Sequence, residues 1–66
     1  MLLNEEEYKK NYDIGKSAMI YGEWKLAYRC FKDCLEYSRS VSAIDDDEIV
    51  QIRKYLSHCS EMLRDK

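Results

Sequence analysis

The thiol and imidazole side chains are the groups in this sequence that could perform chemistry. Cys30 and Cys34 stand four residues apart, and His58 is followed directly by Cys59. Four such ligands could hold a tetrahedral zinc ion, and a cysteine within reach of a histidine could act as a nucleophile. Whether either site forms depends on the elements that carry these side chains.

Those elements are predicted to be helices, because the chain has no proline and only two glycines to interrupt helical hydrogen bonding. The hydrophobic pattern predicts an antiparallel bundle of three helices over about residues 5–20, 23–39 and 46–64. Asn4 with Glu7 predicts a capping box, and Gly22 predicts a left-handed helix end. The serine-rich segment 38–43 predicts a loop.

Each predicted helix has an apolar face that should pack in the core. The face of the first helix comprises Tyr8, Tyr12, Gly15, Ala18 and Met19, extended by Ile14 and Tyr21. The main face of the second helix comprises Trp24, Ala27, Tyr28, Phe31, Cys34 and Leu35. The face of the third helix comprises Ile49, Ile52, Tyr55, Leu56, Cys59, Met62 and Leu63, which leaves Val50 on its outer side.

These faces separate the thiol and imidazole groups. Cys34 and Cys59 fall on core faces, whereas His58 points about 100° away from Cys59 and Cys30 lies beside the main face of its helix. Free cysteine is also a common small core residue. The sequence therefore predicts no metal site, no cofactor and no catalytic residue, and we expect a protein that is not an enzyme.

The first two predicted helices resemble a tetratricopeptide repeat, whose hairpin places small residues where its helices cross. The seven matching residues are Ile14, Gly15, Gly22, Trp24, Ala27, Phe31 and Cys34. Asn11, Ala18 and Arg39 depart from the residues that this family prefers. The pattern occurs once, whereas a solenoid needs about three repeats to bury a continuous core.

With the third helix included, the chain is similar to microtubule-interacting-and-trafficking domains, which are three-helix bundles. The segment Gly22–Ala27, with Phe31 and Cys34, looks like that family's second-helix opening. Residues 55–59 and Met62 look like its third-helix pattern, although His58 and Cys59 replace the usual arginine and alanine. The resemblance implies a groove beside the third helix that binds short segments of other proteins.

The length, the apolar runs and the net charge of the chain predict a small protein that neither spans a membrane nor is generally attracted to nucleic acid. Sixty-six residues make one small domain, and no apolar run is long enough for a signal peptide or a membrane-spanning helix. We therefore expect no membrane insertion, a cytoplasmic location and three reduced cysteines. The net charge of −2 gives no general attraction to nucleic acid.

The second helix carries more apolar circumference, roughly 200°, than two neighbouring helices can cover. Its additional apolar sector comprises Leu26, Cys30, Tyr37 and Val41. A sector left uncovered would be a partner surface, helped by Val50 and Lys54 on the third helix. The sequence thus predicts an adaptor or regulatory inhibitor that docks on another protein or on a second copy of itself.

The alternative prediction is a nucleic-acid-binding regulator. Lys25, Arg29 and Lys32 form a basic strip on the outer side of the second helix, where they could contact phosphate. The same strip could instead be a solvated face paired with Asp33 and Glu36. The negative whole-chain charge and the lack of interleaved aromatic residues favour the solvated face.

Overall fold

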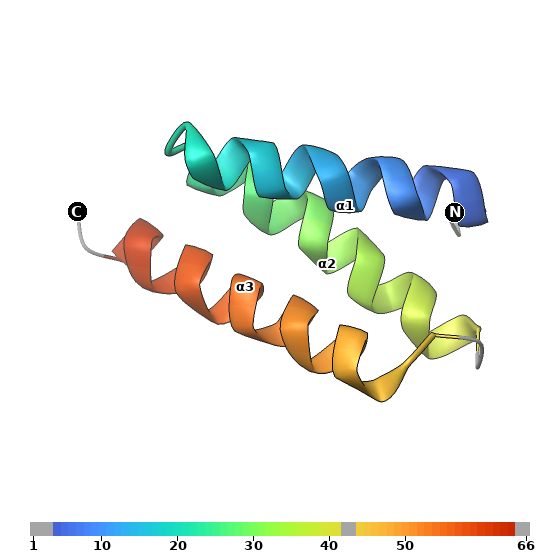
Figure 1. Cartoon of the computed structure of the whole chain (residues 1–66). Coiled ribbons are helices and arrows are strands. Elements are labelled where there is room, and N and C mark those ends of the chain that lie inside the picture. The colour runs from blue at the N-terminus through green and yellow to red at the C-terminus, as the bar shows by residue number, and fades with distance from the viewer. Residues whose placement is uncertain (1–3, 42–43, 65–66) are drawn as a thin grey trace.

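The computed structural model describes residues 4–41 and 44–64, and these form three α-helices (Figure 1). Helix α1 is Glu5–Ile20, α2 is Trp24–Ser40 and α3 is Asp46–Arg64. Successive helices run in opposite directions, so the α1–α2 turn and the end of α3 lie at the same end of the molecule. The predicted all-α, antiparallel three-helix bundle is confirmed, and the helix bounds agree to within one residue.

Helix α2 is the central element of the bundle. Both α1 and α3 pack along it, whereas α1 and α3 hardly approach each other through their backbones. Figure 1 shows the three helices splayed in this way, with α2 passing between the other two. The position of α2 explains its wide apolar circumference, because it must bury one side against each neighbour.

The turn between α1 and α2 is built on Gly22. Its φ of 75° lies in the left-handed region, where residues with a Cβ are strained. The amide of Glu23 donates to the carbonyl of Ala18 at 2.8 Å, and the amide of Gly22 donates to that of Met19 at 3.1 Å. This pair of bonds is a Schellman motif, so the predicted glycine helix end is confirmed.

The core is small and rich in aromatic rings. Its centre is Phe31, whose ring stacks on that of Tyr55 with centroids 4.7 Å apart and meets the edge of Tyr12 at 5.7 Å. Tyr12 also contacts Tyr55 at 6.2 Å, so side chains join α1 to α3 where the backbones do not. The fully buried side chains of largest volume are Phe31, Ile52, Cys34 and Cys59.

The prediction of a loop over residues 38–43 is wrong for its first part, because α2 continues to Ser40. The hydroxyl of Ser38 donates to the carbonyl of Leu35 at 2.6 Å, and that of Ser40 donates to Glu36 at 3.4 Å. Serine hydroxyls bonded back along a helix in this way are compatible with helical geometry. Residues 42 and 43 of the predicted loop lie outside the described residues.

Candidate protein-docking surface

The six residues predicted to bind a partner do not form one surface. Leu26 is 40% exposed and Val50 is 49% exposed. Lys54 is exposed and Val41 is half-buried, where it packs against the core. Cys30 and Tyr37 are only 6% and 8% exposed, so the expectation that these two side chains stay uncovered is wrong.

Helix α1 covers this part of α2. The ring of Tyr37 stacks on that of Tyr8, with centroids 5.0 Å apart. One turn earlier on α2, the thiol of Cys34 donates to the backbone carbonyl of Tyr8 at 3.6 Å. Cys30 precedes Cys34 by four residues and therefore lies on the same side of α2, facing α1.

The two remaining α3 residues lie far from Leu26 along the bundle. Because α2 and α3 are antiparallel, the first half of α3, with Val50 and Lys54, runs beside the second half of α2. Leu26 stands in the first turn of α2, beside the end of α3. The structure therefore separates a Leu26 region from a Val50 region.

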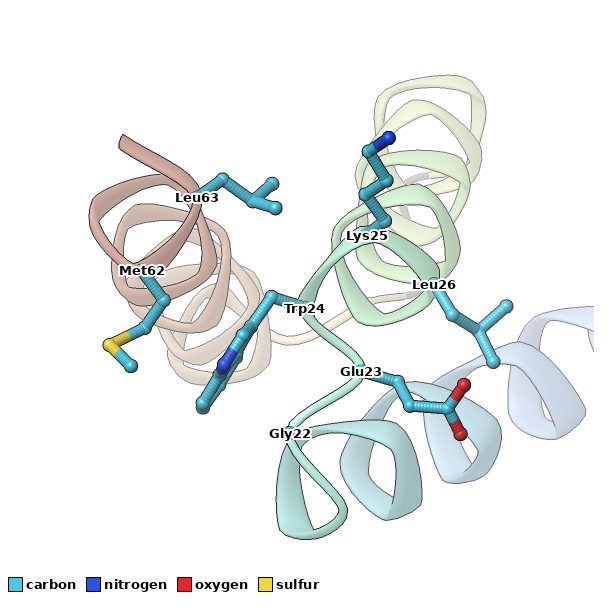
Figure 2. A pocket seen from close by; sticks show the side chains of 7 residues that line it. All are labelled: Gly22, Glu23, Trp24, Lys25, Leu26, Met62 and Leu63. Atoms are coloured by element: carbon cyan, nitrogen blue, oxygen red, sulfur yellow. The ribbon is translucent and has the colours of Figure 1, made fainter. Parts of the chain in front are cut away.

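An open hollow of about 500 Å³ lies at the end of the bundle that carries the α1–α2 turn. We call it the turn-end hollow; its lining residues are Gly22, Glu23, Trp24, Lys25, Leu26, Met62 and Leu63. Figure 2 shows Trp24 of α2 extending toward α3 on the side of Met62, whereas the side chain of Leu63 extends from α3 toward α2. Four of its seven lining residues carry large apolar side chains, so this hollow suits an apolar segment.

A second hollow, of about 260 Å³, lies on the outer side of the α1–α2 pair. We call it the outer groove; its lining residues are Asp13, Ile14, Ser17, Ala18, Tyr21, Glu23 and Leu26. Ile14 is 39% exposed, and Tyr21 and the neighbouring Ile20 are each 80% exposed.

The prediction that Ile14 and Tyr21 extend the core face of α1 is therefore wrong. Helix α2 packs against the small residues Gly15 and Ala18, which leaves the larger side chains outside. The signal that could have shown this is the position of Tyr21 directly before Gly22, since the chain turns away there.

The predicted basic strip is exposed along its whole length, at Lys25, Arg29 and Lys32. Lys25, Leu26 and Arg29 line a third hollow, of about 410 Å³. Among residues 4–41 and 44–64, the ion pair that forms is Lys9 with Glu5 at 3.8 Å, so the expected pairing of the strip with Asp33 and Glu36 is not observed. Leu26 is the residue shared by all three hollows.

The thiols are placed where they react poorly. Burial raises the pKa of Cys34 to about 12 and also raises the pKa values of Cys30 and Cys59. A thiol that stays protonated at neutral pH is a weak nucleophile. In the described part of the chain these three cysteines are free.

His58 is exposed and meets the edge of the Trp24 ring at 5.2 Å, while its neighbour Cys59 is fully buried. The two side chains therefore point in different directions. Among the residues that the structure describes, no group of three or more histidine, cysteine, aspartate or glutamate side chains is arranged to hold a metal ion.

Comparison with known proteins gives no relatives: no family model, no curated protein and no solved structure matches this chain. The resemblances to tetratricopeptide repeats and to trafficking domains remain predictions from the sequence. Within the described ranges, none of the three helices combines the length and the apolar character that crossing a bilayer requires.

Proposed function

We propose that this chain is a non-enzymatic protein–protein interaction module of the cytoplasm, an adaptor or a regulatory inhibitor, that docks a partner protein in the turn-end hollow. The observation that carries the proposal is the gathering of Trp24, Met62 and Leu63 around an open hollow between two helix ends. Contiguous apolar surface of this kind is typical of interaction sites. The hollow also lies beside α3, where the trafficking-domain resemblance would place a bound segment.

The chemistry of the hollow defines the partner segment. Trp24 and the α3 side chains offer an apolar floor, and Lys25 stands exposed at the rim with Arg29 one turn further along α2. An amphipathic helix fits such a site when its apolar residues recur every three or four positions. Acidic residues on the flank of that helix would complement Lys25 and Arg29.

Photo-crosslinking in cells tests this proposal. A photoreactive amino acid at Met62, on the wall of the hollow, should crosslink to one discrete protein that mass spectrometry identifies. The matched control places it at Arg53, an exposed position on the same helix but in its first half. The proposal fails if position 62 gives no crosslinked protein, or the same products as position 53.

The identified partner then allows a quantitative test with purified proteins. Leu63→Asp should raise the dissociation constant at least tenfold, because it places a charge in an apolar contact. Arg53→Asp should leave the affinity within about twofold of the wild type. Circular dichroism must show the same helicity for both variants, since Leu63 is half-buried in the last turns of α3.

The second candidate function is nucleic-acid binding, which is favoured by the exposed Lys25, Arg29 and Lys32, since none of them forms an ion pair within residues 4–41 and 44–64. Fluorescence anisotropy with labelled single- and double-stranded DNA and RNA at low salt distinguishes it from protein docking. Binding that Lys25→Ala with Arg29→Ala abolishes, and whose affinity falls steeply with salt, would support it. Absence of binding at low salt removes it.

A further inference from the structure

The outer face of the α1–α2 pair presents an apolar centre between two flanks of opposite charge. Leu26 is at the centre, and Ile14 and Tyr21 continue the apolar surface onto α1. On one side, Lys25 and Arg29 line a hollow together with Leu26. On the other side, Asp13 and Glu23 line the outer groove.

Figure 2 shows how α2 separates these flanks. Leu26 and Glu23 extend toward α1, whereas Lys25 extends away from it. Lys16, which could neutralise Asp13 from the next turn, lies over the ring of Tyr12 at 5.5 Å instead. Tyr12 contacts α3, so Lys16 is directed toward that side of α1. Within the described residues, neither Asp13 nor Glu23 forms an ion pair, so no cation of the chain neutralises the acidic flank there.

A surface with this arrangement is complementary to itself. In a two-fold symmetric dimer the same patch meets its own copy, so residue i of one chain contacts residue j of the other, and the reverse. An axis through the Leu26 region would place Lys25 and Arg29 of one copy against the acidic flank of the second. A patch of one charge could not pair in this way, because it would repel its copy.

We infer that the outer groove and the Lys25–Arg29 edge together form a two-fold homodimer interface centred on Leu26. Tyr21, 80% exposed beside the groove that it helps to line, supplies a large amphipathic side chain for insertion between the two copies. Such side chains dominate the energy of many interfaces. The flanking charge pairs set the register of the two copies.

Charge exchange between the flanks tests the inference directly. One variant carries Lys25→Glu with Arg29→Glu, and the other carries Asp13→Lys with Glu23→Lys. Size-exclusion chromatography with light scattering should show the wild type as a dimer at about 100 µM and each variant alone as a monomer, because like charges then face each other. An equimolar mixture of the two variants should form a heterodimer, because opposite charges again face each other in both halves of the interface.

Two further variants complete the experiment. Arg53→Glu with Lys54→Glu changes the charge by the same amount on exposed α3 positions and should remain dimeric. Tyr21→Ala, at a side chain that contributes little to the core, should raise the dimer dissociation constant at least tenfold while helicity stays unchanged. A wild type that remains monomeric up to about 1 mM, or a variant mixture that fails to associate, overturns the inference.

The dimer test and the crosslinking test of the proposed function can fail independently of each other. A monomeric wild type that still crosslinks a foreign protein from position 62 refutes the homodimer alone. A dimer that gives no crosslinked protein from position 62 refutes the docking proposal alone. Met62→Lys, which changes the turn-end hollow and leaves the outer groove intact, should keep the charge-dependent dimer.

Discussion

At the scale of single residues, Gly15 of α1 lies directly against the ring of Phe31 of α2. A Cβ at position 15 would lie 2.8 Å from Cζ of the Phe31 ring and 2.9 Å from Cε2. The ring cannot easily move, because Tyr55 stacks on it and Tyr12 meets its edge. Position 15 thus requires glycine because the ring of Phe31 on α2 leaves no room for a Cβ. The backbone conformation at Gly15 does not require glycine.

Gly15→Ala should therefore destabilise the protein by about 1–3 kcal/mol, the usual cost of overpacking, although alanine is the better helix former by about 1 kcal/mol. Urea unfolding followed by circular dichroism measures the change. Adding Phe31→Leu should make the alanine less harmful than it is in the wild-type background. A stabilised Gly15→Ala variant would mean that the helices do not approach this closely.

The buried thiols make stability depend on alkaline pH. The pKa of Cys34 rises from 9.0 to about 12 on folding, so above pH 9 the unfolded chain releases a proton that the folded chain keeps. Ionisation then stabilises the unfolded state, and the free energy of unfolding falls by up to about 1.4 kcal/mol per pH unit for each such thiol. Below pH 9 the thiol is protonated in both the folded and the unfolded chain, so its ionisation should not reduce the free energy of unfolding there.

Urea unfolding at pH 7, 8, 9 and 10 should show a flat region followed by a decline. Cys34→Ala should reduce the slope of the decline, whatever its effect on stability at pH 7, because one of the buried thiols is gone. The raised pKa values of Tyr8 and Tyr12 add to the decline above pH 10. Equal stability at pH 8 and pH 10 would contradict the burial of these groups.

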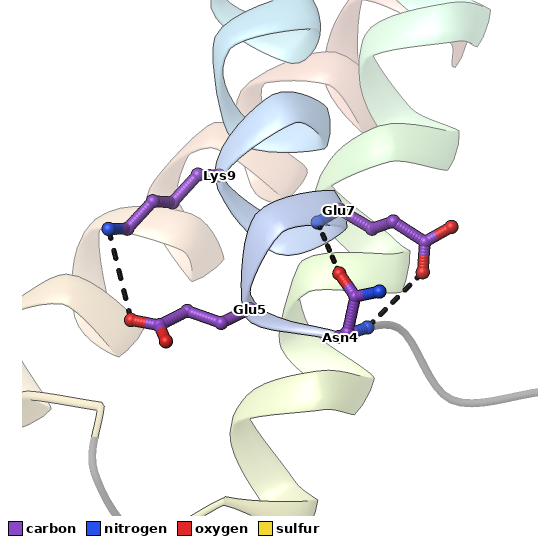
Figure 3. Close-up of polar contacts among 4 residues, drawn as sticks. All are labelled: Asn4, Glu5, Glu7 and Lys9. Carbon is purple, nitrogen blue, oxygen red and sulfur yellow. Dashed lines mark hydrogen bonds and ion pairs between the residues drawn. The ribbon is translucent and has the colours of Figure 1, made fainter.

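At the scale of the helices, α1 has a side-chain cap and α2 does not. The side chain of Asn4 accepts from the amide of Glu7 at 2.8 Å, and the amide of Asn4 donates to the Glu7 carboxylate at 3.2 Å (Figure 3). The predicted capping box is therefore confirmed. Glu23, at the start of α2, makes no side-chain cap, so α2 depends on packing to begin where it does.

Asn4→Ala should cost about 1 kcal/mol of stability, because the amide of Glu7 loses the side-chain oxygen that caps it. Asn4→Ser keeps an oxygen that can accept from the Glu7 amide, so it should cost only about 0.3 kcal/mol of stability. Chemical denaturation of the two variants beside the wild type gives both numbers. Equal losses for alanine and serine would show that the cap is not formed in solution.

The helices were predictable because their signals are local, and the candidate surface was not, because it depends on how helices are placed. Caps, glycine and the apolar period specify where each helix begins and ends. The same period cannot say which sector of α2 meets α1. The pattern therefore predicts Cys30 and Tyr37 at the surface, whereas both are buried and Tyr37 stacks on Tyr8 of α1. Leu26, in the first turn of α2, is the member of that sector that stays exposed.

At the scale of the whole molecule, the bundle is narrow. It measures 36 × 19 × 19 Å, which is about two helix diameters across. A body of this width has room for one layer of core side chains, so its hollows are open depressions between helices. Such depressions suit the side chains of another protein better than they suit an enclosed substrate.

The narrow core also makes the three helices depend on one another. Phe31 of α2 lies between Tyr12 of α1 and Tyr55 of α3, so neither neighbour alone encloses it. A fragment of residues 1–41, which lacks α3, should therefore lose most of its helical signal and show no cooperative thermal transition, since short isolated helices are marginal in water. The full chain at the same concentration is the control. A cooperative melt of the fragment would show that the α1–α2 hairpin is self-sufficient and that α3 is an addition to it.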